Sequence, residues 1–161
     1  MEEPLPRYDL DNLARLTAGS PLPIAGGELN RGLHEFKLMV ERGCYDILQG
    51  DASFSEGMFQ IRKAAAVAEA FGRRFIPHTW SNGIGMRANL QIIASLPNAG
   101  WVEFPYDPPA WTVEARDRML KDPLRLDPDG QITVPQKPGL GFELDEEVVD
   151  RYSLRIEIPE V

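Results

Sequence analysis

Five polar or ionisable residues recur along residues 2–103 at nearly constant spacing. The successive intervals are 26, 23, 27 and 25 residues, close to the length of one strand followed by one helix. If each residue ends a strand of one parallel sheet, all five lie at the same edge, where barrels of alternating strands and helices carry their active sites. Acidic residues are common and often cap helices, which could by chance place two or three of them at strand ends. Five residues in register are harder to explain in this way. The residues are Glu2, Glu28, Asp51, His78 and Glu103.

Two of these residues, His78 and Asp51, have the types that acid–base catalysis requires. An aspartate on a neighbouring strand end can hold one ring nitrogen of an imidazole, fix its tautomer and raise its pKa, which makes the histidine a competent base near neutral pH. Each also has a purely structural interpretation. His78, in Phe-Ile-Pro-His-Thr-Trp, could be a hydrogen-bonded packing residue, Asp51 a cap ahead of Ser53, and Glu103 a surface acid.

Glu2 and Glu28 are carboxylates one strand apart, and Glu3 can stand in place of Glu2. Carboxylate oxygens suit a hard cation such as Mg²⁺. Two ligands are too few for a complete site, and both positions could instead stabilise helix N-termini through the helix dipole. The spacing alone leaves these two interpretations open.

The elements that would position these residues alternate between strand and helix. Helices are expected from the Asp9 cap to residue 18 and over residues 33–42, 56–71 and 86–96; strands are expected over residues 22–26, 45–48, 74–76 and 101–104. Such alternation requires parallel strands joined by helical crossovers, so the predicted fold class is α/β. Prolines and glycines after residue 104 break this pattern.

The chain is accordingly expected to divide into a partial barrel, residues 1–107, and a C-terminal extension, residues 108–161, that packs on the outside. Within the extension we expect a short helix over residues 112–120 and a strand over residues 131–134. No candidate site residue falls in residues 122–161.

Composition excludes several classes of function. The formal net charge of −8 argues against a nucleic-acid partner, because binding to phosphates needs clustered cations. No apolar run reaches the length of a membrane span, and the acidic N-terminus is unlike a signal peptide, so a cytoplasmic protein is expected. The single Cys44 is interpreted as a packing residue and His34 as a solvated surface residue.

Together the motifs resemble the C-terminal half of enolase superfamily enzymes of the mandelate racemase and muconate lactonizing enzyme family, mandelate racemase subgroup. They are Glu-Glu-Pro at residues 2–4, Gly-Gly-Glu at 26–28, Leu-Gln-Gly-Asp-Ala-Ser at 48–53, Pro-His-Thr-Trp at 77–80, Trp-Val-Glu at 101–103 and Pro-Gly-Leu-Gly at 138–141.

The resemblance implies the C-terminal half of a (β/α)₇β barrel and Mg²⁺-assisted abstraction of a proton next to a carboxylate. It implies that Glu2 and Glu28 are metal ligands and that His78 and Asp51 form the catalytic dyad. It also implies that a protonated Glu103 hydrogen-bonds the developing enediolate. The substrate would be a sugar acid or another 2-hydroxy carboxylate, and the enzyme a lyase (dehydratase) or an isomerase (racemase).

The sequence also departs from the family pattern. Gly50 stands where a proline usually precedes the aspartate, and Glu56-Gly57 stands where the family has two glycines. The capping domain, the first barrel half with its Lys-x-Lys motif, and the first aspartate ligand have no counterpart in these 161 residues. The chain is therefore expected to be a partial enzyme that forms a homo-oligomer or pairs with a complementary barrel half.

Three hypotheses follow. The chain could carry the active-site half of an acid-sugar dehydratase or 2-hydroxyacid racemase. It could be a non-catalytic truncated fragment or interaction module. It could also be an unrelated α/β binding domain, in which case the strand-end residues would point to different regions instead of converging.

Overall fold

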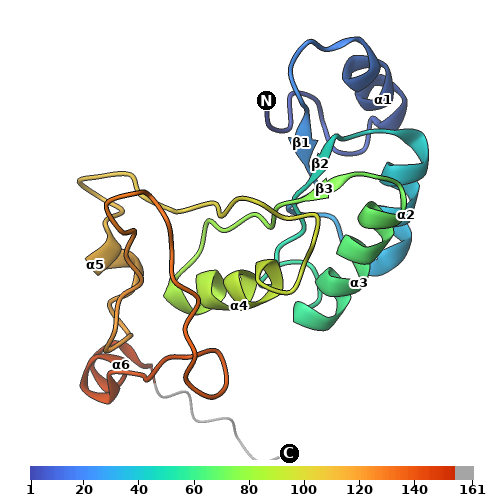
Figure 1. Cartoon of the computed structure of the whole chain (residues 1–161). Helices are drawn as coiled ribbons and strands as arrows, with labels where there is room; N and C mark the ends of the chain where they lie inside the picture. Colours follow the sequence, from blue (N-terminus) through green and yellow to red (C-terminus); the bar gives the residue numbers. More distant parts are fainter. Residues whose placement is uncertain (155–161) are drawn as a thin grey trace, which may run out of the picture.

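A computed structural model of the chain describes residues 1–154, and it confirms the α/β class. Three short parallel strands lie in the order β1-β2-β3 and alternate with helices (Figure 1). The elements are α1 (Leu10–Gly19), β1 (Ala25–Gly26), α2 (Gly32–Arg42), β2 (Ile47–Leu48), α3 (Met58–Ala70), β3 (Arg74–Phe75), α4 (Gly83–Ile93), α5 (Val113–Arg116) and α6 (Glu146–Tyr152).

Local capping signals explain most helix boundaries. The Asp9 side chain accepts a hydrogen bond from the Asn12 amide at the start of α1, as expected. Helix α2 ends at Gly43, whose φ of 70° is a left-handed conformation that suits glycine. Helix α4 begins three residues before the predicted position, because the Asn82 side chain caps it.

Four sequence predictions were wrong in their details. Helix α3 starts two residues late because Glu56 and Gly57 both have positive φ, which is incompatible with a right-handed helix. The expected helix over residues 112–120 is only the short α5. Residues 101–104 and 131–134 are not strands, since neither segment forms a ladder of backbone hydrogen bonds with a neighbour. Helix α6, capped by Asp145, was not predicted.

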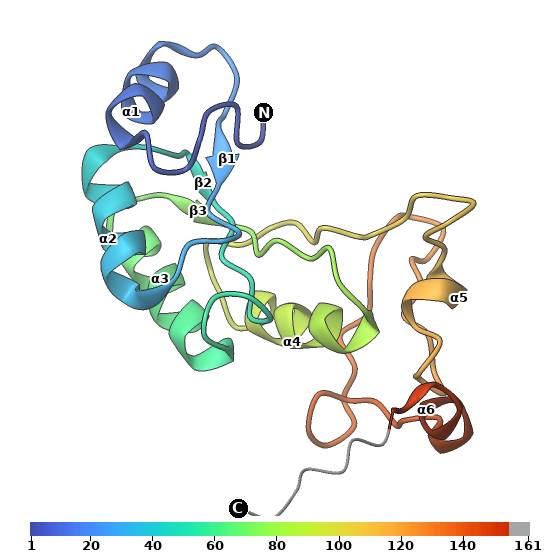
Figure 2. The same ribbon diagram turned by 180° about the vertical axis from the view of Figure 1, so that it is seen from behind.

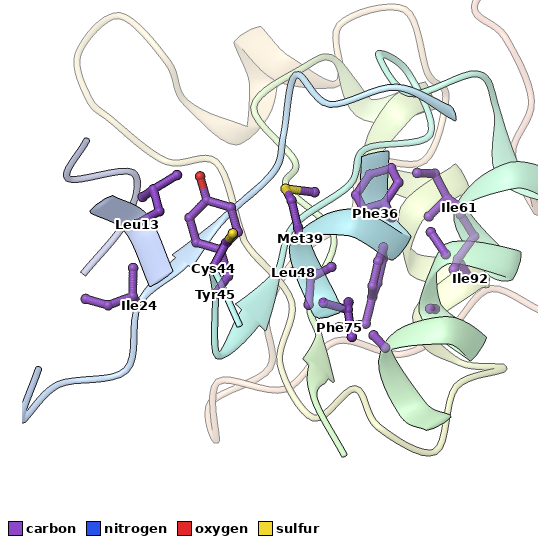
Figure 3. Packing of buried hydrophobic residues seen from close by; sticks show 14 residues of the cluster. Leu13, Ile24, Phe36, Met39, Cys44, Tyr45, Leu48, Ile61, Phe75 and Ile92 are labelled. Atoms are coloured by element: carbon purple, nitrogen blue, oxygen red, sulfur yellow. The ribbon is translucent and has the colours of Figure 1, made fainter. Parts of the chain in front are cut away.

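The main core lies between the strands and helices α1, α2 and α3, which all cover one side of the sheet (Figures 1 and 2). Leu48 and Phe75 are fully buried there, and the Phe75 ring lies 6.1 Å from the ring of Phe36 on α2 (Figure 3). The alternation of side chains along a strand sends the flanking residues to the opposite face of the sheet. Ile47 and Arg74 on that face are partly or largely exposed.

A second, smaller core joins α4 to the C-terminal segment. Met86 and Leu90 of α4 pack with Leu124, and partly buried Phe104 and Val134 extend the cluster. In both views α4 lies between the sheet with its helices and the region of α5 and α6 (Figures 1 and 2).

Among residues 1–154, no helix has the length and apolar character needed to cross a bilayer. The expected extension reaches to residue 161, so its last seven residues lie outside the described part.

Candidate active site

The strand ends meet at one edge of the sheet, as the spacing predicts. Beyond the assigned strands the backbone continues the parallel pairing: the Ile76 amide donates to the Leu48 carbonyl, and the His78 amide donates to the Gln49 carbonyl at 3.2 Å. Glu2 forms a parallel bridge with Ala25 and so adds a fourth chain segment beside β1. The polar residues that follow these segments are therefore brought to the same edge.

His78 lies between two carboxylates. Its Nδ1 is 2.9 Å from Asp51 Oδ2, and its Nε2 is 3.0 Å from Glu28 Oε2. The His78 side chain is 8% exposed, and the ring of Phe54 lies 6.0 Å from the imidazole, centroid to centroid. The contact between Asp51 and His78 is the one that the sequence predicts, whereas the contact between Glu28 and Nε2 was not foreseen.

Asp51 is fully buried and uses both carboxylate oxygens. Its Oδ1 accepts hydrogen bonds from the Ser53 amide at 2.7 Å and from Asn89 Nδ2 at 3.0 Å, while Oδ2 faces His78. The alternative interpretation of Asp51 as a helix cap is thus correct only in part. Asp51 closes a turn at Ser53, but helix α3 begins later and has Gly57 at its N-cap.

Glu103 reaches the same edge although its segment is not a strand. Its Oε2 accepts a 2.5 Å hydrogen bond from the Thr79 amide, next to His78. Burial raises the pKa of Glu103, and the negative charges of Glu2 and Glu28 add to this; the Thr79 hydrogen bond and the charge of His78 partly oppose it. The pKa of Glu103 is therefore above its ordinary value, which favours the protonated carboxyl group.

The carboxylates also shift the pKa of the histidine. Burial by itself lowers the pKa of His78, but the hydrogen bond to Asp51 and the charges of Glu103, Glu28 and Asp51 outweigh burial, so the pKa is raised overall. Glu28 has a raised pKa, mainly through burial, with His78 acting in the opposite direction. Asp51 and Glu28 both contact the His78 ring, and Glu103 accepts from the neighbouring Thr79 amide, so the hypothesis in which these four residues point to different regions is contradicted.

The first candidate metal ligand is better assigned to Glu2 than to Glu3. Glu3 Oε1 accepts a 3.0 Å hydrogen bond from the amide of Gly27, the residue after β1, so this side chain already has a backbone partner. Glu2 is exposed. Oxygen donors of this kind suit Mg²⁺, but residues 1–154 contain no group of three acidic, histidine or cysteine side chains placed to hold a metal ion. The described residues alone therefore do not fit a complete metal site.

One residue of the site, Asn89, was missed from the sequence. It lies on α4, is fully buried and contacts Asp51 directly. A signal was present, because Asn89 is three residues after Met86 and next to Leu90 on the apolar face of the expected helix. A polar side chain on a buried helix face requires hydrogen-bond partners, and those partners are the strand-end loops.

Comparison with known proteins gives a consistent result. A family model described as "Enolase C-terminal domain-like" matches residues 1–148. The chain is 32% identical to D-galactarolactone cycloisomerase from Agrobacterium fabrum over 95% of its length, and 31% identical to arabinonate dehydratase from Saccharolobus solfataricus over 96%. It covers 41% and 40% of these relatives, and thus spans about two fifths of their length.

A solved structure shares the fold. The 3,6-anhydro-D-galactonate cycloisomerase from Zobellia galactanivorans superimposes with a TM-score of 0.83 at 30% identity, over 94% of this chain and 41% of that one. The relatives are thus dehydratases and cycloisomerases of sugar acids.

Proposed function

The chain belongs to the enolase C-terminal domain-like family, and from this premise we propose that its strand-end residues transfer a proton at the carbon next to the carboxylate of a sugar acid. His78 is the acid–base group and Asp51 its partner. The observation that carries the proposal is the buried contact between His78 Nδ1 and Asp51 Oδ2 at 2.9 Å, at the edge where Glu28 and Glu103 also lie.

The dyad defines which ring nitrogen reacts. Asp51 Oδ2 lies 2.9 Å from Nδ1, and with this oxygen accepting the Nδ1–H, Nε2 is the nitrogen that we assign to proton transfer. In this structure Nε2 lies beside Glu28 Oε2. The two relatives are named as a cycloisomerase and a dehydratase, and we propose that proton transfer next to a carboxylate serves either kind of reaction.

Glu103 has the properties needed to stabilise the product of proton removal. Loss of the proton places negative charge on the oxygens of the substrate carboxylate, and a neutral carboxyl group can donate a hydrogen bond to that charge. Burial favours the neutral form of Glu103. Its Oε2 is occupied by the Thr79 amide, which leaves Oε1 as the oxygen that would carry the proton.

Mg²⁺ is the cofactor that the family resemblance implies, and Glu2 and Glu28 are the residues we propose as its ligands in this chain. Because these two carboxylates do not complete a site within residues 1–154, no step of the proposal depends on the metal. The roles of His78, Asp51 and Glu103 are derived from their own contacts.

The test is exchange of the substrate α-hydrogen with deuterium from D₂O, followed by proton NMR on a panel of aldonic and aldaric acids with Mg²⁺, together with release of 2-oxo-3-deoxy acids. We expect exchange by the unmodified chain and a loss of about 10²- to 10⁴-fold in His78→Asn. The matched control is His34→Asn, which changes the other, exposed histidine on α2 and should leave the rate unchanged.

Two results would overturn the proposal. Undiminished exchange in His78→Asn would show that another group moves the proton. The absence of both exchange and turnover in the unmodified chain would favour the alternative hypothesis of a non-catalytic module.

A further inference from the structure

Asn89 on α4 connects the two loops that carry the dyad. Its Nδ2 lies 3.0 Å from Asp51 Oδ1, 2.8 Å from the His78 carbonyl oxygen and 3.3 Å from Thr79 Oγ1. On its other side, Asn89 Oδ1 accepts a 3.0 Å hydrogen bond from the Ala52 amide. A single side chain thus touches both the loop after β2 and the loop after β3.

The location of Asn89 makes these contacts costly to lose. The side chain is fully buried on a helix whose neighbouring Met86 and Leu90 belong to the second core cluster. Asparagine is a poorer helix former than alanine or leucine, and a buried amide without partners is strongly unfavourable. The amide is therefore compatible with this position because the loops supply its acceptors and its donor.

From this arrangement we infer that Asn89 is a positioning residue, which holds the Asp51 carboxylate and the His78 backbone in the orientation that brings Oδ2 and Nδ1 together. With the Ser53 amide, Asn89 supplies two donors to Asp51 Oδ1 and leaves Oδ2 to the imidazole. Because the side chain is 0% exposed, it acts through these residues and not on a bound substrate.

The side chain at position 89 must donate a hydrogen bond to Asp51 Oδ1 and accept one from the Ala52 amide. Aspartate has the same shape and still accepts from the Ala52 amide, but it replaces the donor that faces Asp51 with a second carboxylate oxygen. Two carboxylates at this distance in a buried site repel each other unless one is protonated. Leucine would leave the Ala52 amide without its acceptor and would remove one of the two donors to Asp51 Oδ1.

The experiment compares Asn89→Asp and Asn89→Ala with the unmodified 161-residue chain. The readout is the downfield proton resonance of the His78 Nδ1–H bonded to Asp51, which His34→Asn allows to be assigned because the chain has two histidines. We expect both Asn89 variants to lose or shift this resonance. The matched control is Asn98→Asp, since Asn98 Nδ2 donates to the Ala65 and Arg73 carbonyl oxygens and does not touch the dyad.

Three outcomes of the NMR experiment contradict the inference. The resonance could persist unshifted in folded Asn89→Asp or Asn89→Ala, or it could be lost equally in Asn98→Asp, which would indicate general loosening. The third outcome is measured in a chain that keeps Asn89, so the inference can be tested even if the Asn89 variants fail to fold. In His78→Asn, the side-chain amide resonances of Asn89 must move, and unchanged resonances there would show that the two residues are not coupled.

The expected effect on turnover rests on the proposed function, but the NMR readout does not. If the chain exchanges the substrate α-hydrogen, Asn89→Asp should lower kcat by about 10- to 100-fold with little change in KM. The reason is that Asn89 contacts Asp51 and His78 and does not contact the substrate. A resonance that changes as expected in a chain without turnover would support the positioning role and reject the proposed function. Undiminished turnover with an altered resonance would contradict the positioning role.

Discussion

Replacing Arg87 with methionine should detach the C-terminal segment from α4. The Arg87 side chain lies on α4 and is 2% exposed. Its Nη1 donates to the Gly141 carbonyl oxygen at 2.7 Å, and its Nη2 donates to the carbonyl oxygen of Asp122. The Phe142 ring lies 5.9 Å from the guanidinium carbon. These contacts, with the small core around Leu124, join α4 to the segment over residues 120–145.

The size of the effect follows from the bonds that are lost. Two hydrogen bonds from a charged donor to carbonyl oxygens contribute about 3–6 kcal/mol together. Methionine retains much of the apolar packing. It also removes a buried charged group whose Nε has no hydrogen-bond partner among residues 1–154, and both effects offset part of the lost hydrogen-bond energy. We expect the free energy of unfolding to fall by a net amount of about 2–4 kcal/mol, concentrated in the C-terminal segment.

Urea unfolding and amide hydrogen exchange, read on peptides from residues 120–145 and from residues 32–48, measure this effect. We expect faster exchange in the first region than in the second. The control is Arg125→Met in the same segment, where the side chain is largely exposed and, among residues 1–154, forms an ion pair with Glu114 alone, so stability should barely change. If Arg87→Met unfolds at the same urea concentration as the unmodified chain, with unchanged exchange, Arg87 does not anchor the segment.

Two further predictions concern the main core. Gly26→Ala should destabilise the chain by about 1–3 kcal/mol in urea unfolding, because the new Cβ would lie 2.5 Å from ring carbons of the buried Tyr45; Gly19→Ala, with no atom within 4 Å of the new Cβ, is the control. Equal stability of the two variants would count against this packing. The Cys44 thiol is fully buried and burial raises its pKa, so alkylation at neutral pH should occur only at the rate of unfolding; rapid alkylation of the native chain would contradict its placement.

Much of the site's edge could be predicted from the sequence because strand-end positions repeat with the length of one strand and helix. The interval between Asp51 and His78 predicted that they would meet, and the structure confirms the contact, while their catalytic role stays a prediction. The expected strand over residues 101–104 was wrong, yet Glu103 still reaches the edge through the Thr79 amide. An extended, apolar sequence shows that a segment can form a strand, but a strand also needs a neighbouring ladder of hydrogen bonds.

By itself the sequence determined the alternation of helices and strands over residues 9–93, the Asp9 cap and the spacing of the strand-end residues, because these depend on local side-chain patterns and on the length of each element. Only the tertiary structure decided that Glu28 contacts His78 Nε2, and that Asn89 contacts an aspartate 38 residues away. The Asn89 contact depends on how α4 packs against the loops after β2 and β3, and the Glu28 contact depends on how the residues after β1 and β3 lie relative to one another. No local pattern specifies that packing, since it results from burial of the apolar faces of several elements at once.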